Sequence, residues 1–166
     1  DGFIEWMQFA CLLLAVLIFC LRAWMTPDYR EILSWLAALA CFAAIREMDA
    51  TLDEWVPVIG WKFAYLVVIY PAILIWQNWD GFIRQLSVML ESQAFALLWA
   101  GFIVAIPAAQ LIGHGPLLES LMGEAYDHIY KRVIEESGEI IGYMLLVAGA
   151  AETYFFLGSQ GRSPDR

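Results

Sequence analysis

The chain has 166 residues, of which 61% are hydrophobic and 16% charged, and its mean hydropathy is +0.64. A soluble domain is about 45–50% apolar and about 25% charged, and the high apolar content also excludes a disordered chain. Lys and Arg number 9 against 18 Asp and Glu, so the net charge of −9 would repel a phosphate backbone and excludes nucleic acid as a partner. The three cysteines lie inside apolar runs, which excludes a secreted fold held by disulfides. The class that remains is an all-α integral membrane protein.

Five segments are predicted to cross the membrane, since about 20 apolar residues span the roughly 30 Å hydrocarbon core. These predicted spans cover residues 2–24, 30–48, 59–79, 88–112 and 139–157. We expect the first to be a retained span and not a signal peptide, because it begins with Asp1 and Glu5 and ends in bulky residues. Pro71 and Pro107 are expected to kink the third and fourth spans.

An amphipathic stretch precedes the last predicted span. The fourth span is followed by Gly113, Gly115 and Pro116, which are residues that end a helix. Residues 116–138 then show helical spacing of apolar positions and predict an interfacial helix. The sequence therefore predicts a bundle of about five transmembrane helices in a single domain over 1–157, followed by a polar C-terminal tail over 158–166.

Five spans place the two termini on opposite sides of the membrane. One side would hold Arg22, Arg30, Arg84, Arg162 and Arg166. The other would hold Arg46, Lys62, Lys131 and Arg132. The positive-inside rule then predicts an outside N-terminus and a cytoplasmic C-terminus, by five basic residues against four.

Most acidic residues gather on one predicted side, which holds the N-terminus and the connectors 46–62 and 113–138. Helical spacing places Arg46, Asp49 and Asp53 on one face of a helix. A second polar face follows the amphipathic helix into the last span. The candidate polar cluster consists of Arg46, Glu47, Asp49, Asp53, His114, His128, Arg132, Glu135, Glu136 and Glu139.

One interpretation of this cluster is the solvated face of an interfacial helix. Lys131 with Glu135 and Arg132 with Glu136 have the i,i+4 spacing of ion pairs. Such pairs contribute only about 0.2–0.5 kcal/mol each.

The other interpretation is a polar cavity that opens on the acidic side. Glu135 and Glu139 share a helix face with His128, and the Arg46–Asp53 face lies at the same predicted depth. Ionisable groups that enter a membrane usually face the interior of a bundle, because exposure to lipid is costly.

A metal ion is the cofactor that this cluster could hold. His114 and His128, with Glu135 or Glu139, could form an open zinc site. The sequence lacks the Glu-x-x-His pairs of carboxylate-bridged di-iron bundles. A b-type haem between His114 and His128 is disfavoured, because both histidines lie in a connector and not in facing spans. No serine lies in a nucleophile-elbow pattern.

Two further acids, Glu91 and Glu152, lie inside the fourth and fifth predicted spans. They either hydrogen-bond within the bundle or reach toward the interface. Alternatively, Glu152 ends a polar track that begins at Glu139 and passes Tyr143, which would suit proton movement.

Three functions are compatible with this sequence. The first is a structural or accessory subunit of a larger membrane complex, because 8 Trp, 7 Tyr and 10 Phe offer broad contact surfaces for other helices. The alternative is a membrane-embedded enzyme, metal-dependent or not, that acts on a lipid-like substrate. The third is a proton- or cation-coupled carrier, which the lack of an internal repeat disfavours. The expected partners are the lipid bilayer and other membrane subunits or further copies of the chain.

Overall fold

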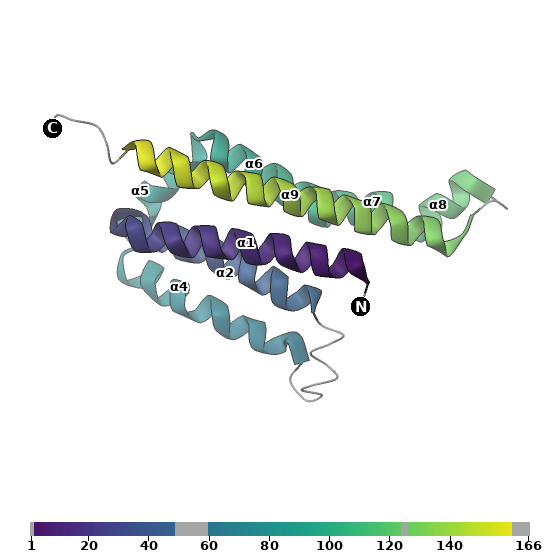
Figure 1. The fold of residues 1–166 in the computed structure, drawn as a ribbon, viewed down its shortest axis with the longest axis horizontal. Coiled ribbons are helices and arrows are strands. Elements are labelled where there is room, and N and C mark those ends of the chain that lie inside the picture. The colour runs from purple at the N-terminus through teal and green to yellow at the C-terminus, as the bar shows by residue number, and fades with distance from the viewer. Residues whose placement is uncertain (1, 49–59, 124–125, 161–166) are drawn as a thin grey trace.

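The described part of the chain is all-helical (Figure 1). The computed structural model describes residues 2–48, 60–123 and 126–160, and no strand occurs among them. The helices are α1 (Phe3–Met25), α2 (Arg30–Glu47), α4 (Tyr65–Gln77), α5 (Trp79–Leu90), α6 (Gln93–Ile103), α7 (Ala109–Ile112), α8 (Gly115–Met122) and α9 (His128–Gln160). Two 3-10 turns, η1 (Pro27–Tyr29) and η2 (Gly60–Ala64), precede α2 and α4, and a π-helical turn, η3 (Val104–Ala108), joins α6 to α7.

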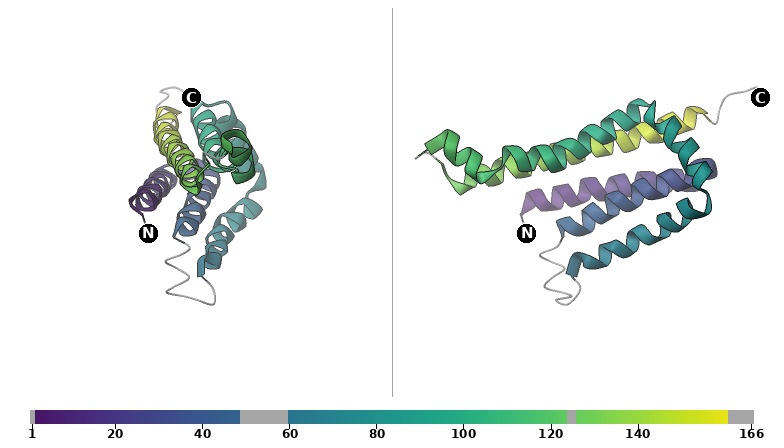
Figure 2. Two further views of the ribbon diagram at one scale, coloured as in Figure 1. Left: turned by 90° about the vertical axis from the view of Figure 1, so that its right-hand side faces the viewer. Right: turned by 180° about the vertical axis from the view of Figure 1, so that it is seen from behind.

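The helices α1, α2, α4, α6 and α9 run side by side along the long axis of the molecule (Figure 2). α9 packs against both α1 and α6, and α2 packs against both α1 and α4. α4 therefore lies at the edge of the bundle. α5 crosses one end of the bundle, between the end of α4 and the start of α6.

Polar residues mark where several helices begin. The side chain of Asn78 accepts a hydrogen bond from the Gly81 amide at the start of α5, and Ser92 Oγ accepts from the Phe95 amide at the start of α6. These bonds satisfy backbone donors that a first turn leaves without partners. Pro27 lies in the first turn of η1, where a missing N–H costs nothing.

The continuous stretch of α6, η3 and α7 approaches α9 closely because small residues face each other. A side chain at Gly101 would lie 2.8 Å from the Gly142 carbonyl oxygen, and one at Gly138 would lie 2.9 Å from Ala109 Cβ. A side chain at Gly142 would overlap the backbone of Ala105. Small residues allow this close backbone packing, which is common where helices associate in apolar surroundings.

Three of the described helices are long and apolar enough to cross a membrane: α1, the continuous Gln93–Ile112 helix, and α9. α4 and α5 meet the same criterion only as a pair, and the two bend by 104° at the break between them. α2 has 18 residues and carries charged residues at both of its ends. Length and composition therefore support three spans, and the predicted count of five is not shown by them.

The predicted connector over residues 80–87 is helical in the structure and belongs to α5. Phe82, Leu86 and Met89 share one face of α5, and this face packs against the main hydrophobic core. The fourth apolar helix consequently begins at Gln93, later than the predicted start at residue 88. α4 begins at Tyr65, later than the predicted start of the third span at residue 59.

The predicted amphipathic helix over residues 116–138 is divided in two. α8 ends at Met122, and Gly123 has φ 55°, a left-handed conformation that glycine adopts without strain. α9 begins at His128 and runs without a break to Gln160, so its first three turns are continuous with the predicted last span. The start of the predicted polar tail, residues 158–160, is also helical.

Candidate functional site

A cavity of about 900 Å³ lies between α1, α2, α5, α6 and α9. Its volume is within the range of about 300–1,000 Å³ that is typical of small-molecule sites. Apolar side chains from all five helices form most of its wall, including Leu12, Phe19, Leu36, Met89, Leu98 and Leu146.

The cavity is elongated along the helix axes. On α1 its lining residues extend from Glu5 to Phe19, which is a rise of about 21 Å at 1.5 Å per residue. On α2 they extend from Ile32 to Glu47. All charged lining residues lie where α1 begins and α2 ends, and the opposite end beside α5 is apolar. The cavity is therefore amphipathic, with a polar end and a long apolar body.

Gln8 is the most deeply buried polar residue at the polar end. It is 1% exposed, although it lies in an otherwise apolar helix. Its Nε2 donates a hydrogen bond to Glu139 Oε2 at 3.1 Å. A buried amide without a partner is costly, so this bond explains why a glutamine is tolerated at this position of α1. The bond also connects α1 to α9.

A second hydrogen bond at the polar end joins α9 to α2. The Tyr143 hydroxyl donates to Glu47 Oε1 at 2.5 Å. Tyr143 is 6% exposed and lies one helical turn after Glu139, so both side chains face the cavity. A bond from a hydroxyl to a carboxylate is stronger than one between neutral groups.

Arg132 forms the rim of the polar end. Its Nε donates to Glu136 Oε1 at 2.5 Å, and its Nη2 lies 3.9 Å from Glu5 Oε1. The arginine side chain is 69% exposed, so solvent weakens both ion pairs. The rim therefore connects α9 to the first turn of α1 with little contribution to stability.

The carboxylate of Glu139 lies in a mixed electrostatic environment. The carboxylates of Glu47 and Glu135 repel it, and the guanidinium of Arg46 attracts it. Arg46 is exposed while Glu139 is half-buried. Attraction from an exposed, hydrated cation only partly offsets the repulsion between partly buried carboxylates.

One long side of the cavity is open between α2 and α6. Leu39 of α2 and Trp99 and Phe102 of α6 line the cavity, yet they are 45%, 53% and 44% exposed. A molecule can therefore reach the apolar body from the side.

The structure brings together part of the predicted polar cluster. Four of its residues line the cavity: Arg46, Glu47, Glu136 and Glu139. Arg132 adjoins them through its ion pairs. Asp49 and Asp53 lie outside the described residues.

Three other residues of the predicted cluster do not line the cavity. Glu135 lies beside Gly113 and forms an ion pair with Lys131 at 3.8 Å. His114 and His128 are exposed, and His128 Nδ1 lies 3.5 Å from the Tyr126 hydroxyl. Glu135 and His128 therefore do not share this cavity with Glu139.

The structure does not gather the predicted metal ligands. Among the residues it describes, no group of three or more His, Cys, Asp and Glu side chains is placed to hold a metal ion. Glu91 is exposed at the end of α5, and Glu152 is half-buried in α9. Neither of these two acids lines the cavity.

Sequence reasoning missed several residues of the polar end. Glu5, Gln8, Gln110 and Tyr143 line the cavity but were not in the predicted cluster. Glu5 and Gln8 lie three positions apart in the first span, so they share one helix face. A lone glutamine on the same face as an acid was the signal that could have identified them.

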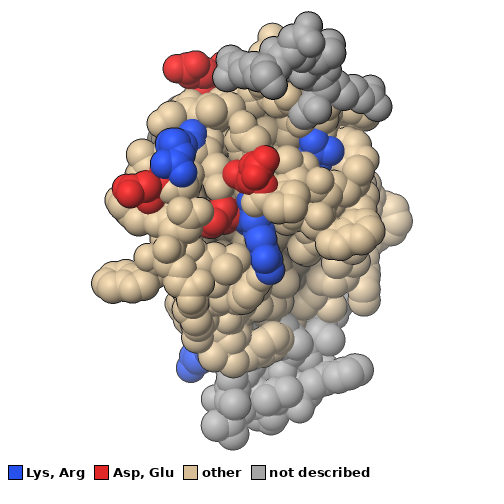
Figure 3. Space-filling view, turned by 90° about the vertical axis from the view of Figure 1, so that its left-hand side faces the viewer, with Lys and Arg blue, Asp and Glu red and all other residues tan. Residues whose placement is uncertain are grey.

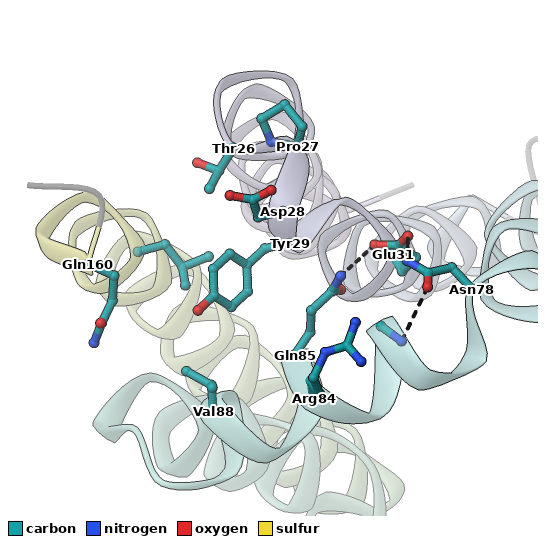
Figure 4. A pocket seen from close by; sticks show the side chains of 12 residues that line it. Thr26, Pro27, Asp28, Tyr29, Glu31, Asn78, Arg84, Gln85, Val88 and Gln160 are labelled. Carbon is teal, nitrogen blue, oxygen red and sulfur yellow. Dashed lines mark hydrogen bonds between the residues drawn. The ribbon is translucent and has the colours of Figure 1, made fainter. Parts of the chain in front are cut away.

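A second hollow of about 580 Å³ lies at the opposite end of the bundle (Figure 4). Glu31 accepts hydrogen bonds there from Asn78 Nδ2 at 2.7 Å and from Gln85 Nε2 at 2.5 Å. Gln85 Oε1 also accepts from the Ile32 amide at 3.1 Å. These groups satisfy one another and fasten α5 to the start of α2. Acidic and basic side chains alternate over this end of the molecule (Figure 3).

No protein-family model matches the chain, and no curated protein or solved structure matches it. The chemistry of the cavity is therefore what indicates a function. Its body can hold a hydrocarbon chain, and its polar end offers several carboxylates. A tyrosine hydroxyl that donates to a carboxylate can also accept a hydrogen bond from a bound polar group.

Proposed function

We propose that this chain is a five-span membrane protein that binds an amphipathic, lipid-like molecule in the cavity between α1, α2, α5, α6 and α9. The hydrocarbon chain of the ligand occupies the apolar body, and its polar group lies beside Glu139 and Tyr143. The observation that carries the proposal is the amphipathic lining of one elongated cavity.

The dimensions of the cavity support this proposal. Its length along α1, about 21 Å at 1.5 Å per residue, exceeds the roughly 15 Å depth of one leaflet, which is half of the hydrocarbon core. A chain of leaflet length therefore fits along it. The open side between α2 and α6 would face the hydrocarbon core, so a lipid could enter without crossing water.

The proposal favours the lipid-directed alternative among the three functions that the sequence suggested. An enzyme acting on the bound molecule would use the same polar end, where the carboxyl groups of Glu47 and Glu139 can accept or donate a proton. Binding comes before any such reaction, so binding is what the first experiment measures.

Native mass spectrometry of the detergent-solubilised protein with hexadecanol tests the proposal. We expect saturable binding of one molecule to the wild-type chain. Ala40 lines the cavity, and Ala40→Phe fills part of the apolar body. We expect this variant to lower the affinity about tenfold or more, which corresponds to about 1.4 kcal/mol.

Ala96→Phe is the matched control, because Ala96 is exposed on α6 and does not line the cavity. It should bind hexadecanol like the wild type. Ala43→Phe provides a second cavity-filling variant if Ala40→Phe alters the melting temperature. Binding that does not saturate, or wild-type binding by both folded cavity variants, contradicts the proposal.

One observation favours the accessory subunit as a second candidate function. α4 lies at the edge of the bundle and exposes a row of large side chains: Leu66, Ile69, Tyr70, Ile73 and Trp76. Another membrane helix could cover this face. Trp76→Cys should then form a cross-link to a neighbouring chain in membranes, whereas Trp24→Cys on α1 should not.

A further inference from the structure

We infer that the molecule held in the cavity is a long-chain amine, whose cationic nitrogen lies among the carboxylates of the polar end. This inference rests on the proposed function and adds the chemical class of the ligand's polar group. It follows from the charge and the hydrogen-bonding capacity that the polar end presents.

The polar end has more negative than positive charge. Its lining includes four glutamates: Glu5, Glu47, Glu136 and Glu139. Among the described lining residues Arg46 is the only cation, and Arg132 at the rim pairs with two of the four glutamates. Two negative charges remain in excess when all of these groups are ionised.

Two of the neutral hydrogen-bond donors at the polar end, the Gln8 amide and the Tyr143 hydroxyl, bind carboxylates. Gln8 Nε2 donates to Glu139, and the Tyr143 hydroxyl donates to Glu47. An ionised carboxylate can only accept hydrogen bonds, through about four lone-pair sites. A ligand that supplies N–H donors and a positive charge therefore complements this end, because carboxylate acceptors and negative charge are in excess there.

An anionic head group fits less well. A phosphate or carboxylate would bring further acceptors and further negative charge next to Glu139, which Glu47 and Glu135 already repel. Arg46 is the lining cation that could receive an anion, but it is exposed and attracts Glu139. Like charges placed together in a partly desolvated site are strongly unfavourable.

The apolar body of the cavity determines the chemistry of the ligand's second part, its hydrocarbon chain. The lining from Leu12 to Phe19 on α1, and on to Met89 of α5, contains no charged side chain. A soluble diamine or a bare metal ion would leave this space unfilled. A single hydrocarbon chain attached to the amine fills it, and the hydrophobic effect stabilises that arrangement.

Competition between hexadecylamine, hexadecanol and hexadecyl phosphate tests the inference, because the three share one chain and differ in charge. Native mass spectrometry at neutral pH measures their relative occupancy of the wild-type protein. We expect hexadecylamine to bind roughly tenfold more tightly than hexadecanol, which corresponds to about 1.4 kcal/mol. Either head group can donate a hydrogen bond to a carboxylate, but only the ammonium adds an attraction between opposite charges. Hexadecyl phosphate should bind most weakly.

Two isosteric variants test whether the carboxylates of the polar end cause the preference for the amine over the alcohol. Glu139→Gln and Glu47→Gln each remove one negative charge and keep the shape of the side chain, so each should lower the amine-to-alcohol ratio several-fold. Glu119→Gln on α8 is the matched control, because Glu119 is exposed and does not line the cavity. Its ratio should equal that of the wild type. The melting temperature of each variant verifies that it is folded.

The outcomes separate this inference from the proposed function. Equal binding of hexadecylamine and hexadecanol, or a preference for hexadecyl phosphate, overturns the inference and leaves lipid binding in place. A ratio that neither folded glutamine variant changes also overturns it. Saturable binding of none of the three compounds overturns the proposed function itself.

Discussion

Two side chains of α9 form hydrogen bonds with other helices: Glu139 with α1, and Tyr143 with α2. Gln8 of α1 donates to Glu139, and Tyr143 donates to Glu47 of α2. These bonds form in partly buried surroundings, where an unpaired polar group is costly. The same residues therefore hold three helices together and define the polar end of the cavity.

Tyr143→Phe measures the contribution of one of these bonds. It removes the hydroxyl from a nearly buried ring and leaves Glu47 without that donor. Hydrogen bonds to charged groups contribute about 1.5–3 kcal/mol, so we expect a loss of unfolding free energy of about that size. Denaturant titration of the protein in mixed micelles, followed by circular dichroism, measures the change.

Tyr154→Phe is the control for this prediction. The Tyr154 hydroxyl lies 3.7 Å from Met25 Sδ, and the ring that lies under the Arg22 guanidinium is unchanged by the substitution. This variant should lose less than about 1 kcal/mol, since sulfur is a weak acceptor. A Tyr143→Phe variant as stable as Tyr154→Phe would show that the bond to Glu47 contributes nothing.

The contact between α6 and α9 depends on the absence of side chains at particular positions. Gly142 packs directly on Ala105 in the π-helical turn η3, so a methyl group there would overlap backbone atoms. We expect Gly142→Ala to lower the unfolding free energy by about 1–3 kcal/mol, the usual cost of overpacking. Thermal unfolding in detergent provides the measurement.

Gly158→Ala is the matched substitution in the same helix. A side chain at Gly158 would meet its nearest atom, Arg22 Nη2, at 3.7 Å, which is an ordinary contact. Alanine also favours a helix over glycine by up to about 1 kcal/mol. Gly158→Ala should therefore be neutral or stabilising, and equal destabilisation by both variants would argue against close packing as the cause.

α5 is fastened to α2 by one buried side chain. Gln85 is 6% exposed, accepts from the Ile32 amide and donates to Glu31. Gln85→Leu keeps a similar volume but leaves the amide at the start of α2 without its acceptor, at a cost of about 1–3 kcal/mol. Hydrogen exchange should also accelerate at Ile32, whereas Ser87→Ala on the exposed face of α5 should leave both properties unchanged.

At the scale of the whole molecule, the arrangement of helices predicts which loops share a side of the membrane. Ser87 belongs to α5 and Ser120 belongs to α8, and these two helices lie at opposite ends of the bundle (Figure 1). In a variant with Cys11, Cys20 and Cys41 replaced by alanine, Ser87→Cys and Ser120→Cys should react with an impermeant thiol reagent from opposite sides of sealed vesicles. Labelling of both from the same side would contradict the proposed spans.

The amino-acid sequence determined the helical class of this protein and the bounds of α1 and α2 to within one residue. Apolar runs such as residues 3–25 lack the regularly spaced polar residues that form the exposed face of a helix in a soluble protein. The glycines and proline near residue 114 end a helix regardless of what surrounds it. Helix class and helix ends are local properties, because neighbouring residues supply the hydrogen bonds and the steric limits that decide them. The short helix α5 was missed because its apolar face needs the bundle against which it packs.

Only the tertiary structure decided which polar residues meet. The sequence placed Glu135 and Glu139 on one helix face, but in the structure Glu135 lies beside Gly113 and Glu139 bonds to Gln8. The cavity likewise depends on the close contact between α6 and α9 and on the distance between α2 and α6, which involve residues far apart in the chain. Such distances follow from how whole helix surfaces fit together, and residue spacing along a single helix does not contain that information.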